Sequence, residues 1–106
     1  MISKDQILQR IKDSVKSTAP DATLILYGSY ARGDYREDSD IDLLVLVTAD
    51  KISPDDEIKI KYPLYHIETD TGIIISPLVL PKKTWETRHR ISPFYQNVTT
   101  EGIKLL

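Results

Sequence analysis

The chain lacks cysteine, which excludes disulfide bonds, thiolate metal sites and a cysteine nucleophile. It also lacks long apolar runs: none approaches the length needed to cross a membrane, and the opening MISKDQILQR has no apolar core of the kind found in signal peptides. Its formal net charge of −2 provides no excess of basic residues for a broad nucleic-acid-binding surface. We therefore expect a cytoplasmic protein without a membrane span.

The composition that remains is typical of a globular protein. Apolar residues make up 41% and charged residues 28% of the 106 positions. This length is sufficient for one hydrophobic core, and the sequence shows no internal repeat, low-complexity tract or linker. We expect residues 1–106 to form a single domain that depends on partners for any larger assembly.

Hydrophobic periodicity predicts an alternation of helices and strands. Ser3 and Gln6 form a capping box ahead of apolar residues at helical spacing, and Ser53-Pro54 is typical of a helix N-terminus. Pro63 lies inside the second long helical pattern and predicts a kink or an early end there. The expected elements are a helix over 4–18, a strand over 22–27, a turn over 29–33, a strand over 40–48, a helix from 54, a strand over 73–80, a short helix over 81–89, a helix from 93 that Gly102 ends, and a tail over 103–106.

A glycine turn and two aspartates constrain how the strands pair. The first strand ends at Gly28-Ser29, and the second begins with Asp40 and Asp42. If both groups act on one ligand, these strands must be antiparallel neighbours, and a right-handed crossover then makes the third strand parallel to the second. We expect an α+β fold with a small mixed sheet, in which the second strand is central and Pro77 marks the third as an edge strand or a bulge.

The stretch from Gly28 to Val47 carries the residues suited to chemistry. Residues two apart in a strand point to the same face, so Asp40 and Asp42 project together with Cα atoms about 6.6 Å apart. Such carboxylates repel each other unless a hard divalent cation binds between them; the alternative is a solvated strand end with a turn-capping aspartate. At Gly28 and Ser29, a backbone without a Cβ can bring N–H groups against a phosphate.

These residues resemble a known family. Gly28-Ser29, Ala31-Arg32-Gly33 and Ser39-Asp40-Ile41-Asp42 are similar to the GS-x-ARG…SD-x-D signature of the DNA polymerase β-like nucleotidyltransferase superfamily, in its minimal, single-domain form. The resemblance implies transfer of a nucleoside monophosphate, for which we expect AMP from ATP, to a protein or small-molecule acceptor. It also implies that Asp40 and Asp42 are catalytic and hold two Mg²⁺ ions, and that Gly28 and Ser29 bind the triphosphate.

Two alternative roles can be assigned to Arg32 within this signature. Its guanidinium can contact a phosphate or the acceptor, because its donors form a fork that matches oxyanions. The alternative is a structural pair with Asp34 or Asp38. We include Arg32 among the expected nucleotide-binding residues.

The sequence departs from the family at the third carboxylate. Catalytic members usually carry a further acid on the next strand, and that place falls on Ser76, whose hydroxyl cannot replace a carboxylate as a base or a strong cation ligand. Glu68 and Asp70 precede that strand closely enough to substitute for the missing acid. We take Glu68 as the candidate third catalytic residue.

Two partner hypotheses follow from the resemblance. Minimal members of the group resemble the antitoxin half of a toxin–antitoxin module, in which a small helical toxin is the partner that becomes modified. If no acid completes the site, the alternative is a degenerate module that holds a nucleotide or a partner protein without turnover. Trp85 and Phe94-Tyr95 either cover a sheet face or form an oligomer contact, and the sequence leaves both open.

Histidines and helical tyrosines have simpler expected roles. His66 and His89 have no partner at ligand spacing, so we expect each to be a surface or packed histidine. Tyr62 and Tyr65 recur at helical spacing, which favours a core-facing position over base stacking.

Overall fold

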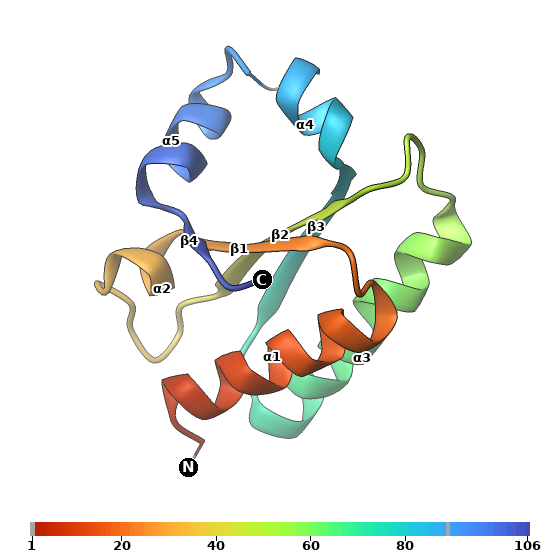
Figure 1. The fold of residues 1–106 in the computed structure, drawn as a ribbon. Helices are drawn as coiled ribbons and strands as arrows, with labels where there is room; N and C mark the ends of the chain where they lie inside the picture. Colours follow the sequence, from red (N-terminus) through yellow and green to blue (C-terminus); the bar gives the residue numbers. More distant parts are fainter. Residues whose placement is uncertain (1, 89) are drawn as a thin grey trace.

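Figure 1 shows the computed structural model, which describes residues 2–88 and 90–106. The elements follow in the order α1 (Lys4–Thr18), β1 (Thr23–Tyr27), α2 (Ser29–Arg32), β2 (Ile41–Val47), α3 (Pro54–Thr71), β3 (Ile75–Pro81), α4 (Lys82–Arg88), α5 (Pro93–Glu101) and β4 (Ile103–Lys104). The prediction for His89 lies outside the described residues. The strands form one sheet with helices on both of its faces.

The sheet has the strand order β3-β2-β1-β4. β1 pairs with β2 in antiparallel fashion and β2 pairs with β3 in parallel, so the predicted α+β fold with a mixed sheet is confirmed. β2 is central, and β3, which contains Pro77, lies at an edge as expected. The predicted tail is wrong in part, because Ile103 and Lys104 form β4 against β1. A two-residue strand has no alternating pattern long enough to identify it in a sequence.

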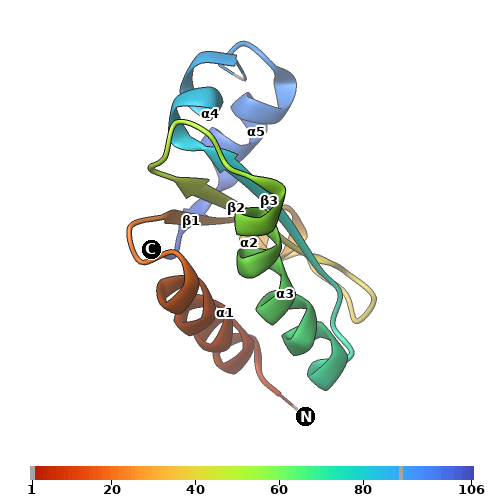
Figure 2. The ribbon, with the colours of Figure 1, turned by 90° about the vertical axis from the view of Figure 1, so that its right-hand side faces the viewer.

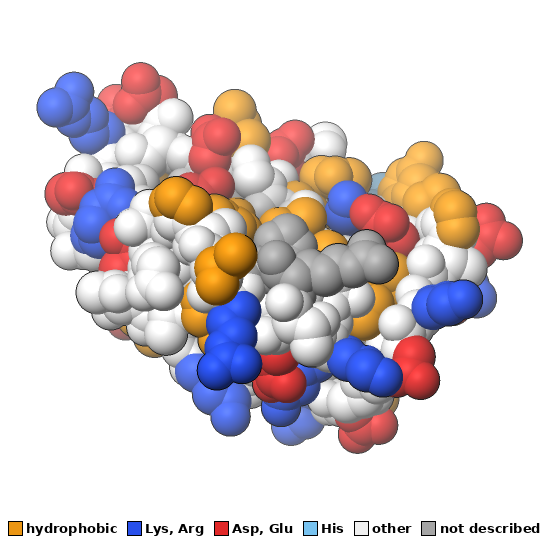
Figure 3. All heavy atoms as spheres, turned by 90° about the horizontal axis from the view of Figure 1, so that it is seen from above, with side chains coloured by type: hydrophobic (Ala, Val, Ile, Leu, Met, Phe, Trp, Pro, Cys, Tyr) orange, Lys and Arg blue, Asp and Glu red, His pale blue; other side chains and the backbone are white. Residues whose placement is uncertain are grey.

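The two sheet faces have separate hydrophobic cores. α1 and α3 lie side by side on one face, and α4 and α5 lie on the other (Figures 1 and 2). Successive β2 residues alternate between them: Leu43 and Val45 pack with α1 and α3, whereas Leu44 and Leu46 pack with Trp85 of α4. β2 is therefore apolar on both faces, as expected of a central strand. On the α4–α5 face, acidic and basic side chains are interspersed around apolar ones (Figure 3).

The helix ends follow their predicted capping chemistry. Ser3 Oγ accepts from the Gln6 backbone N–H at 3.1 Å, and the Gln6 side chain accepts from the Ser3 N–H at 2.8 Å, which completes the capping box. At the start of α3, the Ser53 Oγ accepts from the Asp56 backbone N–H at 3.1 Å. Among residues 2–88 and 90–106, which the structure describes, no helix is both long enough and apolar enough to cross a membrane.

Of the two outcomes predicted for Pro63, a kink or an early end, the early end is wrong. The helix continues to Thr71, where Gly72 closes it in the left-handed conformation. Buried Ile60, Leu64 and Ile67 pack against the sheet, and this burial offsets the hydrogen bond that proline removes.

The two tyrosines of α3 face solvent, contrary to the prediction. The exposed fraction is 62% for Tyr62 and 41% for Tyr65. The apolar stripe lies on the neighbouring helical face, because Ile60, Leu64 and Ile67 repeat at spacings of four and three. Exposed His66 has its ring near that of Tyr62, in agreement with a surface histidine.

Candidate active site

Gly28 joins β1 to α2 in a conformation that few other residues adopt. Its φ of 75° and ψ of −157° turn the chain sharply, and its carbonyl accepts from the N–H groups of Ala31 and Arg32, each at 3.1 Å. A Cβ at this position would overlap Oδ2 of Asp42. The glycine therefore allows the turn backbone to lie directly against the Asp42 carboxylate, and Ser29, predicted with Gly28 as a phosphate ligand, begins α2 at this turn.

Asp42 lies in the centre of the sheet, between two neighbours. Its Cα pairs with Tyr27 in β1 and with Ser76 in β3, so the three side chains share one row on the α4–α5 face. Partial burial of the carboxyl raises the pKa of Asp42, the nearby Asp40 raises it further, Arg32 opposes the shift, and Glu101 adds to it. The ionised form of Asp42 is therefore disfavoured in this environment, and a bound cation would stabilise it.

Asp40 and Asp42 fit a magnesium ion by their donor chemistry. Asp40 is exposed just before β2, two residues from Asp42, and its charge contributes to the raised pKa of the Asp42 carboxyl. Mg²⁺ is commonly held by one or two carboxylates together with substrate phosphates and water. Within ranges 2–88 and 90–106, no group of three His, Cys, Asp or Glu side chains is arranged to hold a metal. A cation here would take its remaining ligands from a phosphate and solvent.

Arg32 is engaged by two carboxylates. Its Nε donates to Asp34 Oδ2 at 3.2 Å, and its Nη1 donates to both carboxylate oxygens of Glu101, each at 3.2 Å. The structure thus shows the pair with Asp34 that the sequence left open. It also places the guanidinium close enough to Asp42 to oppose the rise in that carboxyl's pKa. Arg32 therefore belongs to the same cluster as Gly28 and Asp42.

Glu101 is the site residue that the sequence analysis missed. It ends α5, and its Oε1 also accepts from the Gly28 backbone N–H at 3.3 Å, across 73 positions in sequence. Only 24% of its side chain is exposed. The sequence signal, a glutamate before the glycine that ends a helix, is too common to indicate a site. Its position depends on β4, which pairs with β1 and returns the end of α5 to Gly28.

The third acid is absent from the strand position where the family usually has it. Ser76 pairs with Asp42, so its predicted location beside the aspartates is confirmed, and it offers a hydroxyl there. The Glu68 carboxylate accepts from the backbone N–H of Ile75 at 2.8 Å, on the side of the sheet that packs with α3. Asp70 forms an exposed ion pair with Arg10 at 2.9 Å. These contacts give both acids structural partners on the face opposite Asp42.

Aromatic side chains border the site on the α4–α5 face. The Phe94 ring packs edge-on against Tyr27 at 5.3 Å between centroids and against Trp85 at 5.6 Å. Trp85 also contacts Tyr95 at 4.9 Å. The sequence left two roles open for Trp85 and Phe94-Tyr95, and in the structure these side chains cover a face of the sheet. Burial among these rings raises the pKa of the Tyr27 phenol, and the Asp42 charge adds to the effect.

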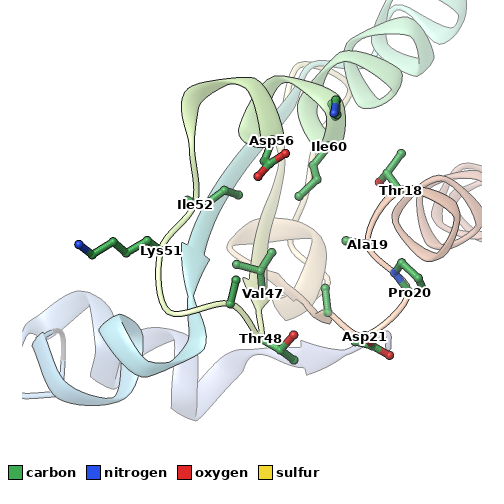
Figure 4. A pocket seen from close by; sticks show the side chains of 13 residues that line it. Thr18, Ala19, Pro20, Asp21, Val47, Thr48, Lys51, Ile52, Asp56 and Ile60 are labelled. Atoms are coloured by element: carbon green, nitrogen blue, oxygen red, sulfur yellow. The ribbon is translucent and has the colours of Figure 1, made fainter.

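A pocket of about 240 Å³ lies at the other end of β2 and is separate from this cluster (Figure 4). Val47 and Thr48 line it, together with the α1–β1 connection and the start of α3. Val47 and Asp42 are five positions apart in an extended strand, which corresponds to roughly 16 Å. A larger groove of about 880 Å³ borders the loop after α2, where it is lined by Tyr30, Tyr35 and Arg36.

Comparison with known proteins shows what this arrangement resembles. The model of a family described as nucleotidyltransferase domain matches residues 8–94. "Putative protein adenylyltransferase MJ0141" of Methanocaldococcus jannaschii is 38% identical over 103 residues, which cover 94% of this chain and 96% of that protein.

Two solved structures share the fold at low identity. One, a toxin–antitoxin with AMP-PNP, has a TM-score of 0.67 and 21% identity, and the match covers 93% of this chain and 72% of that one. The other is a tri-AMPylated HEPN toxin of Shewanella oneidensis in complex with an MNT antitoxin; its TM-score is 0.64 at 19% identity, with 98% and 72% covered.

Proposed function

The chain belongs to the nucleotidyltransferase domain family, and on this basis we propose that it transfers the adenylyl group of ATP to a protein acceptor. The single observation that supports this most strongly is the contact between Gly28 and Asp42, because it brings the backbone turn that would bind a phosphate against a carboxylate suited to a cation. Asp40 and Asp42 would hold Mg²⁺, and Gly28, Ser29 and Arg32 would bind the triphosphate.

In this reaction an acceptor oxygen replaces pyrophosphate on the α-phosphorus of ATP, and the acceptor's proton is released. Bound Mg²⁺ would neutralise the charge that develops on the attacking and leaving oxygens. Asp40 and Asp42 would hold the cation at the start of β2, the central strand, and their mutual repulsion would favour its binding. The Gly28 N–H and the Arg32 guanidinium position the phosphates. Catalysis by this chain would consist mainly of positioning and electrostatics.

A protein acceptor is favoured by the relatives. The Methanocaldococcus relative is named as a protein adenylyltransferase, and a structural neighbour is a complex in which a toxin carries AMP groups beside its antitoxin. By analogy, the partner of this chain would be a small helical toxin that it binds and modifies.

A second candidate function is a binding module without turnover. It is favoured by one observation: the strand position next to Asp42 carries Ser76, and Glu68 is bound to Ile75 N–H on the other side of the sheet. Such a module would hold ATP or a partner protein but would release no pyrophosphate.

The two functions separate in a labelling experiment. The protein is incubated with Mg²⁺ and a cell lysate, in parallel with ATP labelled at the α-phosphate and ATP labelled at the γ-phosphate. Compared with lysate alone, adenylyl transfer predicts additional protein-bound label from the α-position and none from the γ-position, and the loss of this additional label in Asp42→Ala. Equal labelling with Asp42→Ala would contradict the assigned roles, and binding of ATP without label transfer would favour the binding module.

A further inference from the structure

An anion already lies on the donors that the proposed function assigns to the triphosphate. The Glu101 carboxylate accepts from the Gly28 N–H at 3.3 Å and from Arg32 Nη1 through both oxygens at 3.2 Å. Backbone N–H groups and guanidinium forks bind phosphate and carboxylate oxygens by the same charge-assisted hydrogen bonds. A triphosphate and Glu101 therefore compete for the same atoms.

The position of Glu101 is fixed by the fold. Gly102 ends α5 with its N–H on Val98 O at 2.7 Å, and a Cβ on Gly102 would overlap Val98 O and crowd Ile25 of β1. Next along the chain, β4 pairs with β1, and the backbones of Leu24 and Leu105 are hydrogen-bonded. The backbone of Glu101 is thus held from both sides, and only its side chain can turn away from Gly28.

We propose that Glu101 is an affinity-determining residue that occupies the triphosphate site from within, so that nucleotide binds only when the Glu101 side chain leaves Gly28 and Arg32. This inference rests on the proposed function, because it takes the triphosphate to bind there. The inference extends the proposed function to Glu101, which is remote in sequence from Gly28. Glu101 weakens nucleotide binding and keeps Arg32 paired in the free protein.

The local charges act in the same direction. Arg32 is shared between Asp34 and Glu101, and Asp40 and Asp42 add two further carboxylates nearby. Polyphosphate entering this cluster meets more negative than positive charge, so removal of the Glu101 charge favours binding in addition to freeing the donors. If Glu101 occupies the donors for about nine-tenths of the time, the apparent affinity for nucleotide is reduced about tenfold.

The test is a calorimetric titration of the full chain with a nonhydrolysable ATP analogue and Mg²⁺. Glu101→Gln keeps the size of the side chain and one acceptor oxygen but removes the charge that strengthens its contacts with both donors, and Glu101→Asp keeps the charge but is one methylene too short to reach both donors. Asp34→Asn is the matched control, because Asp34 binds the same guanidinium but not the Gly28 N–H. We expect Glu101→Gln to bind about tenfold tighter than the unmodified chain, Glu101→Asp to bind tighter by a smaller factor, and Asp34→Asn to change affinity less than twofold, about the effect of one exposed ion pair.

The outcomes separate this inference from the proposed function. Unchanged or weaker binding by both Glu101 variants, with the unmodified chain binding normally, would overturn the inference and leave the function in place; Glu101 would then only position Arg32. Failure of every protein to bind the analogue would overturn both. Melting curves identify a variant that fails to fold, and the amide resonance of Gly28 provides a second readout: it should shift on adding inorganic triphosphate to the unmodified chain, and an unmoved resonance would count against the competition.

Discussion

Gly28 and Asp42 are in such close contact that the space for a side chain at Gly28 is filled by the Asp42 carboxylate. Asp42 belongs to β2, and Gly28 directly follows β1, the antiparallel neighbour of β2, since Tyr27, which precedes Gly28, pairs with Asp42. The glycine turn and the aspartate thus form one unit, in which a bound phosphate and a bound cation would be neighbours. This unit is the structural basis of the proposed nucleotidyl transfer.

Substitution of Gly28 should therefore affect both stability and ligand binding. Gly28→Ala places a Cβ at φ 75° and ψ −157°, a region that essentially only glycine adopts, which costs about 1–3 kcal/mol, and adds an overlap with Asp42. Gly33→Ala is the control for a positive φ alone, because Gly33 is left-handed with a φ of 85° and has nothing within 4 Å of its Cβ position. Urea unfolding should show a larger loss for Gly28→Ala, with loss of Mg²⁺-dependent ATP binding in that variant alone. Equal effects of the two substitutions would show that the contact with Asp42 has no role.

The raised pKa of Asp42 gives a pH-dependent stability. Because the folded chain holds this proton more tightly than the unfolded chain, ionisation of Asp42 removes stability as pH rises from its ordinary value of 3.8 through the raised value. Asp42→Asn should therefore melt a few degrees higher than the unmodified chain at pH 7 without Mg²⁺, and the gain should vanish well below the ordinary pKa. Thermal melts at neutral and acid pH measure this difference, with the exposed Asp50→Asn as control. A variant that melts lower at pH 7 would contradict the assigned environment of Asp42.

Ser76 is the position where an added acid should strengthen the cation site. Neighbouring strands lie about 4.8 Å apart, so Ser76→Asp would place a carboxylate beside that of Asp42. We expect a loss of stability without metal, from repulsion, and an increase in Mg²⁺ affinity of about tenfold, or about 1.4 kcal/mol, measured by calorimetry. Ser76→Asn has the same shape without the charge and should show neither effect. No change in Mg²⁺ affinity in Ser76→Asp would place the cation elsewhere.

Glu68 should contribute to stability and not to ligand binding. Glu68→Ala removes the acceptor for Ile75 N–H and should cost about 1 kcal/mol in the free energy of unfolding. Glu68→Gln retains an acceptor oxygen and should lose less. Both variants should bind ATP and Mg²⁺ like the unmodified chain, and a tenfold loss of binding would restore Glu68 to the active site.

Much of the fold and half of the site could be predicted from local sequence patterns. Capping residues and periodicity placed α1, and the need for Gly28 and Asp42 to meet gave the antiparallel pairing of β1 and β2. The orientation of α3 was predicted incorrectly, because its tyrosines and its true apolar stripe have similar spacing and burial alone distinguishes them. Glu101 could not be predicted, since its contact with Gly28 depends on the two-residue strand β4. Residues that are brought together by a short strand far away in the sequence have no local sequence pattern that predicts their contact.

We propose that Asp40 and Asp42 hold Mg²⁺ for a nucleotide bound at Gly28. The most direct measurement is calorimetric binding of a nonhydrolysable ATP analogue, with and without Mg²⁺, to the unmodified chain and to Asp40→Asn/Asp42→Asn. We predict that binding requires Mg²⁺ in the unmodified chain and that the double variant has lost this dependence, with an affinity at least about tenfold lower. Equal, Mg²⁺-dependent affinity in both proteins would contradict the claim.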